Sequence, residues 1–128
     1  ADMGLITALK SHVEDVARLN GLEADFSIVG KARSFPSDVE ECLYRVGQEA
    51  LANVVKHARA SKVEVVLEFK NGSCSLMVAD NGQGFNGSKP QESMGINNMK
   101  KRVESLAGTF SLELNNGCGV CVRAKVPV

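Results

Sequence analysis

Apolar residues recur every three or four positions over residues 4–20, 38–58 and 96–106, which is the spacing of a helix with one buried face. In the first stretch this face is formed by Leu5, Leu9, Val13 and Val16. Gly21 follows the first stretch and Gly108 the third, and each predicts a helix end. Three helices are therefore expected.

The second predicted helix has a defined start and an apolar face. Ser37-Asp38-Val39-Glu40 is a capping box, in which Ser37 is the expected N-cap residue and Glu40 stands three positions further on. The side chains that can cover a sheet are Cys42, Leu43, Val46, Ala50, Leu51 and Val54. The helix is thus expected to pack against a sheet.

Five other segments are predicted to be strands, most of them because apolar and polar residues alternate. These segments are residues 23–29, 62–69, 73–79, 109–114 and 119–126. Asn71-Gly72 predicts a tight hairpin between the second and third strands, and Asn115-Asn116-Gly117 a turn between the last two. Helices interspersed among antiparallel hairpins indicate a two-layer α/β sandwich whose helices cover one face of the sheet.

The composition indicates one soluble folded domain, since 44% of the 128 residues are hydrophobic and 23% are charged. The 15 Lys and Arg residues balance the 15 Asp and Glu residues, which argues against a direct nucleic-acid partner, because wrapping nucleic acid requires excess positive charge. No apolar run approaches the roughly 20 residues that span a bilayer. The first residues carry no signal-peptide core.

The four cysteines, Cys42, Cys74, Cys118 and Cys121, are expected to be reduced thiols in such a chain. Cys118 and Cys121 form a C-x-x-C pair, but a zinc site requires a second ligand pair at matching spacing. A redox pair would precede a helix, whereas this pair lies in a strand-like segment. We therefore expect neither zinc binding nor redox chemistry here.

A stripe of polar residues follows the second predicted helix. Glu49, Asn53, and Lys56 or His57 stand at positions i, i+4 and i+7 or i+8, so they share one face. A carboxylate, an amide oxygen and a base in this order could place oxygen ligands on Mg²⁺ and a cation near phosphate. Spacing alone favours the simpler interpretation, a solvated polar face.

The sequence Asp80-Asn81-Gly82-Gln83-Gly84-Phe85 directly follows a predicted strand. An ionised carboxylate at a strand end can accept a hydrogen bond from an exocyclic amine such as that of adenine. Gly82 and Gly84 allow the backbone to approach a flat ligand closely. Ordinary turn chemistry explains the same residues.

Gly95 opens the third predicted helix, at the end of an unusually long connection from residue 80 to residue 95. The free N–H groups at the start of a helix, together with its dipole, favour an anion such as phosphate. Lys100, Lys101 and Arg102 add positive charge nearby. The alternative is an ordinary helix start whose cations face water.

The order of these three features resembles the N box and the two glycine boxes of the histidine kinase, gyrase and Hsp90 ATPase superfamily. The resemblance covers nearly all of residues 1–128, and residues 43–58, 80–85 and 99–103 carry it. It is strongest to the catalytic and ATP-binding domain of bacterial sensor histidine kinases, in the compact-lid group that pairs with helix-turn-helix response regulators. It implies an α+β, Bergerat-type fold: a mixed, mostly antiparallel sheet of about five strands under three helices.

The resemblance also assigns roles. Asn53 looks like the magnesium ligand, and Glu49 matches the carboxylate that activates water in the hydrolysing relatives. Asp80 looks like the residue that reads adenine. The remaining residues expected to contact ATP are Lys56 and His57 near the phosphates, Gly82 and Gly84 beside the base, and Gly95, Ile96, Asn97, Asn98 and Met99 behind a lid formed by residues 86–95.

Three features depart from the family pattern. Ser93 stands where the second glycine box commonly begins with glycine, and Val120 follows Gly117-Cys118-Gly119 where the family often has threonine. The phosphoacceptor histidine of a complete kinase is not evident, because His12 is followed by Val13 and lies on a helix of this domain. The chain is therefore expected to be a fragment of a longer kinase that lacks its sensor and phosphoacceptor domains.

The hypothesis is a protein histidine kinase catalytic domain that binds Mg-ATP and donates the γ-phosphoryl group to a histidine on a separate dimerisation domain. A response regulator with a helix-turn-helix output domain would then receive the phosphoryl group. The isolated domain is expected to be a cytoplasmic monomer, whether or not the parent kinase is anchored in a membrane. Two alternatives are an anti-sigma-type serine kinase and a nucleotide-binding module without phosphotransfer.

Overall fold

The computed structural model describes residues 4–58, 60–82, 94–114 and 119–128. Its elements, in chain order, are α1 (Gly4–Asn20), β1 (Glu23–Val29), α2 (Ser37–Asn53), the π-helical turn η1 (Val54–Ala58), β2 (Lys62–Lys70), β3 (Ser73–Asp80), α3 (Met94–Glu104), β4 (Thr109–Leu114) and β5 (Val120–Pro127). Each predicted helix and strand is present, with ends that differ by at most two residues apart from the π-helical turn.

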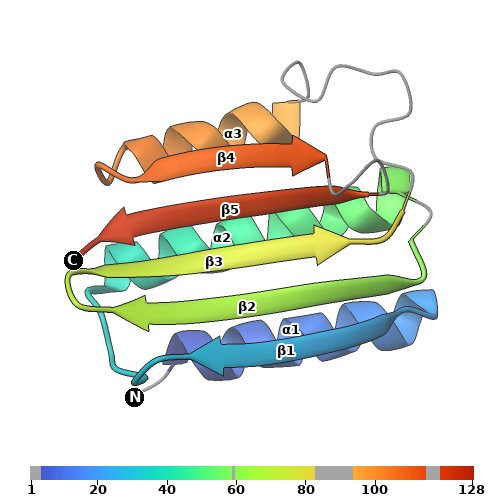
Figure 1. The fold of residues 1–128 in the computed structure, drawn as a ribbon, viewed down its shortest axis with the longest axis horizontal. Coiled ribbons are helices and arrows are strands. Elements are labelled where there is room, and N and C mark those ends of the chain that lie inside the picture. The colour runs from blue at the N-terminus through green and yellow to red at the C-terminus, as the bar shows by residue number, and fades with distance from the viewer. Residues whose placement is uncertain (1–3, 59, 83–93, 115–118) are drawn as a thin grey trace.

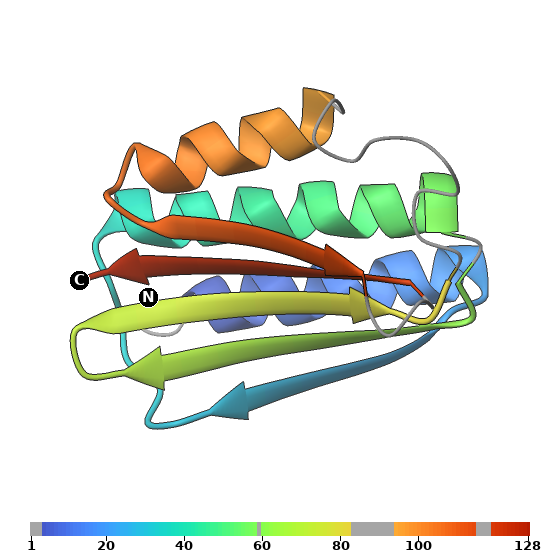
Figure 2. The same ribbon diagram turned by 45° about the horizontal axis from the view of Figure 1, so that its top comes forward.

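The strands form one sheet in the order β1-β2-β3-β5-β4 (Figure 1). β1 runs parallel to β2, and the other neighbours are antiparallel. All three helices lie on one face of this sheet, as the view in Figure 2 shows. The predicted α+β fold, a two-layer sandwich with a mixed and mostly antiparallel sheet, is therefore confirmed.

The core lies between the sheet and the helices. Alternation along β2 buries Val63, Val65 and Leu67 to less than 2% exposure, so each points toward the helical layer. The helical layer contributes Leu5, Leu9, Val13, Val39, Leu43, Val46, Ala50, Leu51, Ile96, Met99 and Val103. Because α2 lies between α1 and α3 and packs on the sheet, its position is fixed on three sides.

The capping-box prediction was wrong in its main residue. The N-cap is Pro36, with φ −52° and ψ 149°, and Ser37 is already helical and makes no side-chain cap bond. Because the proline ring restricts φ near this value, the chain enters the helix one residue earlier than the box implies. Glu40 still reaches back, since its Oε2 accepts a hydrogen bond from the Phe35 N–H at 3.0 Å.

The turns follow the glycine pattern only in part. Lys70 pairs with Ser73 and Gly72 has φ +80°, so the Asn71-Gly72 hairpin is confirmed. After α3 the left-handed residue is Ala107, with φ 62°, rather than Gly108. The predicted turn at residues 115–117 lies outside the described residues.

The cysteines that the structure describes, Cys42, Cys74 and Cys121, are free and buried, as predicted, and Cys118 lies outside the described residues. Burial raises the pKa of Cys74 to about 12, so its reactive thiolate is scarce at neutral pH. None of the helices in the described ranges is long and apolar enough to cross a membrane.

Candidate functional site

One end of the sandwich collects the polar residues that the sequence singled out. α2 and β3 run toward this end and finish there, while α3 and β5 begin there (Figure 1). The β2–β3 hairpin and the C-terminus lie at the opposite end (Figure 1). The antiparallel pairing of β3 with β5 produces this arrangement, because it places Asp80 beside the start of β5.

Glu49 of α2 lies against the first turn of α3. A Cβ atom added to Gly95 would collide with Glu49 Oε1 and would lie 3.2 Å from its Cδ and 3.4 Å from its Cγ. Gly95 is therefore small because the Glu49 side chain occupies the adjacent space. The structure thus brings together two residues, 46 positions apart, that the sequence assigned separately to catalysis and to ATP binding.

Asn53 is the last residue of α2, and its side chain is only partly exposed. Its Nδ2 atom is buried and has no hydrogen-bond partner among the described residues. A buried polar group without a partner costs about 1–3 kcal/mol. The amide therefore fits a site that a ligand completes, since a bound nucleotide offers acceptors and its Mg²⁺ accepts an amide oxygen.

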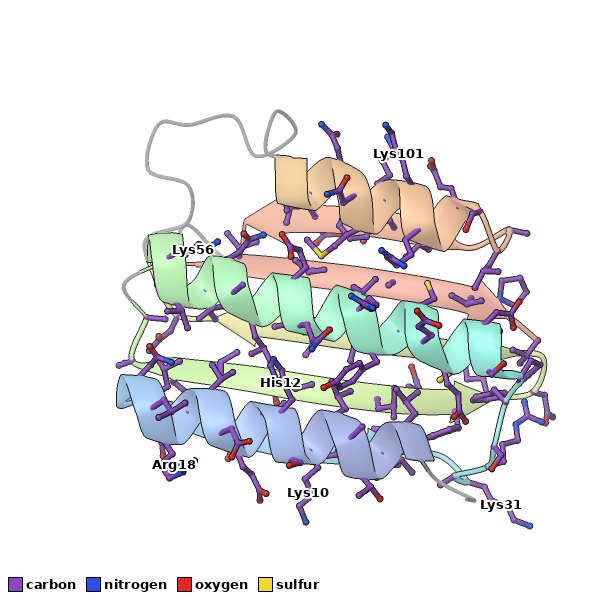
Figure 3. The ribbon with its side chains drawn as sticks, turned by 180° about the vertical axis from the view of Figure 1, so that it is seen from behind. Lys10, His12, Arg18, Lys31, Lys56 and Lys101 are labelled. Carbon is purple, nitrogen blue, oxygen red and sulfur yellow. The ribbon has the colours of Figure 1, made fainter. Side chains whose placement is uncertain are left out.

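The helix does not continue regularly after Asn53. Val54–Ala58 form a π-helical turn, which the apolar period did not predict. A π turn holds more residues than an α turn, so Lys56 rotates less far around the axis than regular spacing implies. Lys56 is exposed and borders a hollow of about 390 Å³ between α1 and α2, together with His12 and Gln48. Figure 3 labels Lys56 and His12 on the helical side of the protein.

His12 belongs to the packing of the domain, as its sequence context indicated. Its ring meets the Tyr44 ring edge-on, with centroids 6.0 Å apart and an interplanar angle of 67°. This geometry is favourable for aromatic pairs and links α1 to α2.

Asp80 ends β3 and is only 4% exposed. Its Oδ1 atom accepts a hydrogen bond from the Gly82 N–H at 2.8 Å, and its carboxylate also accepts one from the backbone N–H of Val120. Burial raises the pKa of Asp80, and these two backbone bonds oppose the rise because they favour the ionised form. A buried acceptor at a strand end is the kind of group that can read an amine on a base.

Asn81 fixes the direction of the chain after Asp80, a role that the sequence analysis missed. Its Oδ1 accepts hydrogen bonds from the N–H groups of Ser61 and Lys62, both at 3.0 Å. Its Nδ2 donates to Ser61 Oγ at 2.9 Å. The end of β3 is thereby tied to the segment that enters β2, which follows the π turn.

The start of α3 divides into two kinds of side chain. Ile96 and Met99 are buried in the core, at 4% and 2% exposure, so only their backbone could meet a ligand. Asn97 and Asn98 are exposed. The cations of this helix are also exposed, and Lys101 points away from the body of the protein (Figure 3).

Some predicted site residues cannot be placed. Gly84, Ser93 and residues 86–93 of the expected lid lie outside the described residues. The side chain of His57 is likewise not described. The roles of these residues, and of all the other predicted site residues, stay predictions.

The buried acid at the end of β3 and the buried amide nitrogen at the end of α2 lie at the same end of the sandwich, as the resemblance to an ATP-binding domain of the sensor histidine kinases implies. The chain belongs to the family described as "Histidine kinase-, DNA gyrase B-, and HSP90-like ATPase", which matches residues 38–128. The resemblance to the histidine kinase, gyrase and Hsp90 ATPase superfamily is therefore confirmed.

The relatives with the most similar sequences include histidine kinases of signal transduction. The chain is 37% identical over 128 residues to the signal transduction histidine-protein kinase/phosphatase DegS of Brevibacillus brevis, covering 99% of this chain and 33% of that protein. It is 35% identical over 126 residues to the sensor histidine kinase LiaS of Bacillus subtilis, covering 98% of this chain and 34% of that protein. The chain thus spans about a third of the length of these relatives.

Solved structures agree with the fold. The histidine kinase domain from the Erythrobacter litoralis EL346 blue-light activated histidine kinase superposes with a TM-score of 0.74 at 19% identity, over 96% of this chain and 60% of that one. The mycobacterial sensor histidine kinase MprB gives a TM-score of 0.70 at 19% identity, over 99% of this chain and 95% of that one. At this level of identity the likeness shows the fold alone.

Proposed function

We propose that this domain binds Mg-ATP and donates its γ-phosphoryl group to a histidine on a separate dimerisation domain of a two-component sensor kinase. The observation that carries the proposal is the buried Nδ2 atom of Asn53, which has no hydrogen-bond partner among the described residues and lies at the same end of the sandwich as the buried acid Asp80. The sensor kinases among the relatives support this function.

In this proposal each described residue has one task. Asp80 accepts a hydrogen bond from the adenine amino group, and Gly82 lets the chain pass close to the base. Asn53 would hold Mg²⁺ through its amide oxygen, and the ion supplies charge neutralisation across the phosphates. Glu49 lies against the start of α3, and its proposed task is to orient or polarise the attacking group.

The phosphotransfer needs positioning more than covalent work by the protein. A nitrogen of the acceptor imidazole attacks the γ-phosphorus, the bond between this phosphorus and the β–γ bridging oxygen breaks, and ADP leaves. Gly84, Gly95, Asn97, Asn98, Lys56 and His57 are proposed to surround the phosphates and the base, with residues 86–95 as the lid. Ile96 and Met99 would contribute backbone groups only.

We place the partners by the same reasoning. The phosphoacceptor domain belongs to the same kinase, and the phosphoryl group then passes to an aspartate of a response regulator with a helix-turn-helix output domain. Because ATP is the proposed substrate, the domain is expected to face the cytoplasm. The isolated domain is expected to be a monomer. Such a domain on its own should bind nucleotide and hydrolyse it slowly at most.

A transfer experiment tests the function. The domain is incubated with γ-labelled Mg-ATP and, in trans, with a dimerising helix hairpin from a DegS-type kinase. Label that is lost in acid and kept in alkali indicates phosphohistidine and supports the proposal. Acid-stable label on serine would support the anti-sigma-type serine kinase instead. A chain that binds ATP but transfers no phosphate to any tested hairpin would support the binding module.

A further inference from the structure

The backbone at the start of β5 lies so close to Asp80 that no side chain fits between the two segments. Gly119 is buried and has φ +86°. A Cβ atom added there would collide with the carbonyl oxygen of Asp80 and would lie 2.7 Å from both its carbonyl carbon and its Oδ1. Because most of these atoms belong to the backbone, neither the end of β3 nor the start of β5 could move to make room without a cost in packing energy.

The next residue contributes a hydrogen bond. The backbone N–H of Val120 donates to the Asp80 carboxylate, which also accepts from the Gly82 N–H. A carboxylate held by two fixed N–H donors keeps its orientation. Both donors are backbone groups, so neither hydrogen bond depends on which side chain stands at residue 120.

We infer that Gly119 and Val120 are positioning residues that aim the Asp80 carboxylate at the amino group of adenine and so set the preference for adenine nucleotides. This inference rests on the proposed function and deepens it. It also gives a reason why valine is acceptable at residue 120, since the backbone N–H provides the support for Asp80. A glycine at residue 119 is required because only backbone fits against Asp80.

The test compares two glycine substitutions. Gly119→Ala and Gly72→Ala both put alanine at positive φ, +86° and +80° respectively, but nothing lies within 4 Å of a Cβ at Gly72. The two variants therefore share the backbone strain, and only Gly119→Ala displaces Asp80. Affinities for Mg-ATP and for magnesium inosine triphosphate, which has a carbonyl oxygen in place of the adenine amino group, are measured by calorimetry.

We expect Gly119→Ala to weaken Mg-ATP binding roughly tenfold or more, by loss of a charged hydrogen bond, while inosine triphosphate changes about twofold at most. The ratio of the two affinities should fall toward one in Gly119→Ala and stay at the wild-type value in Gly72→Ala. A wild-type ratio in folded Gly119→Ala overturns the inference. Wild-type protein that binds no Mg-ATP refutes the proposed function instead, so the two failures are distinguishable.

A second variant decides the matter if Gly119→Ala does not fold. Cys118 precedes Gly119, so residues 118–128 can be made as a synthetic peptide and joined to residues 1–117 by native chemical ligation. An ester in place of the Val120 amide removes the N–H and keeps the valine side chain. Compared with a ligated wild-type chain, the ester should show the same loss of the ATP preference, and an unchanged preference overturns the inference.

Discussion

Asp80→Asn replaces one oxygen of a buried carboxylate with an amino group at almost constant size. In the native protein the Gly82 N–H donates to Oδ1 at 2.8 Å, and the Val120 N–H donates to the same carboxylate. An asparagine that keeps the bond to Gly82 must place its oxygen at the Oδ1 position. Its amino group then stands where the second carboxylate oxygen was. In the proposed complex this amino group would face the amino group of adenine, and two donors cannot form a hydrogen bond.

The size of the effect follows from the burial of Asp80, which is only 4% exposed. Breaking one partner of a buried, charged hydrogen bond costs about 2–5 kcal/mol. Since about 1.4 kcal/mol corresponds to a factor of ten, the Kd for Mg-ATP is expected to rise by roughly 30-fold to 5,000-fold.

Isothermal titration calorimetry of Mg-ATP into wild type and Asp80→Asn measures this ratio. Asp25→Asn is the matched control, because Asp25 is 61% exposed, lies on β1 and pairs with Lys62 at 3.4 Å, and its Kd should equal that of wild type. Circular dichroism verifies that all three chains are folded. Equal affinities in wild type and folded Asp80→Asn would falsify the assignment of Asp80 to adenine.

Three further outcomes are expected. Burial raises the pKa of Asp80. Without ligand, folding therefore favours the protonated acid, and wild type should lose stability relative to Asp80→Asn as the pH rises above the ordinary aspartate pKa of about 4, as measured by scanning calorimetry. A constant difference over this range would contradict the expectation. Asn81→Ala removes three hydrogen bonds and should lower the free energy of unfolding by about 1–3 kcal/mol in urea titrations; unchanged stability would contradict it. Because burial raises the pKa of Cys74 to about 12, a thiol reagent at neutral pH should modify Cys74 only as fast as the protein unfolds, and rapid modification of folded protein would exclude this environment.

Local sequence periods predicted the elements well because burial on one face imposes them directly. The alternation along β2 and the helical period of α2 both depend only on residues that are close together in the sequence. The same spacing placed Glu49 and Asn53 on α2 correctly, and a strand followed by Asp80 placed this acid at a strand end. These features needed no knowledge of which elements pack together.

The features that were missed depend on contacts between distant segments. Gly119 is small because the backbone of Asp80, 39 positions earlier, occupies the adjacent space. Asn81 bonds to Ser61 and Lys62, which no short-range pattern marks. The π turn at Val54–Ala58 follows the α-helix with too small a change in the spacing of apolar residues for the sequence to predict it. The N-cap residue is Pro36 rather than Ser37, because the restricted φ of proline allows the helix to begin one residue earlier.

ATP is proposed to bind at the end of the sandwich where α2 and β3 finish and α3 begins. Two-dimensional amide spectra of the ¹⁵N-labelled chain, recorded during titration with Mg-ATP, locate the binding site. Binding at this end should give saturable shifts at Asn53, Asp80, Gly82 and Gly95, and unchanged signals at the opposite end around Gly72. Shifts confined to the hairpin end, or no shifts at millimolar Mg-ATP, would contradict the proposed site.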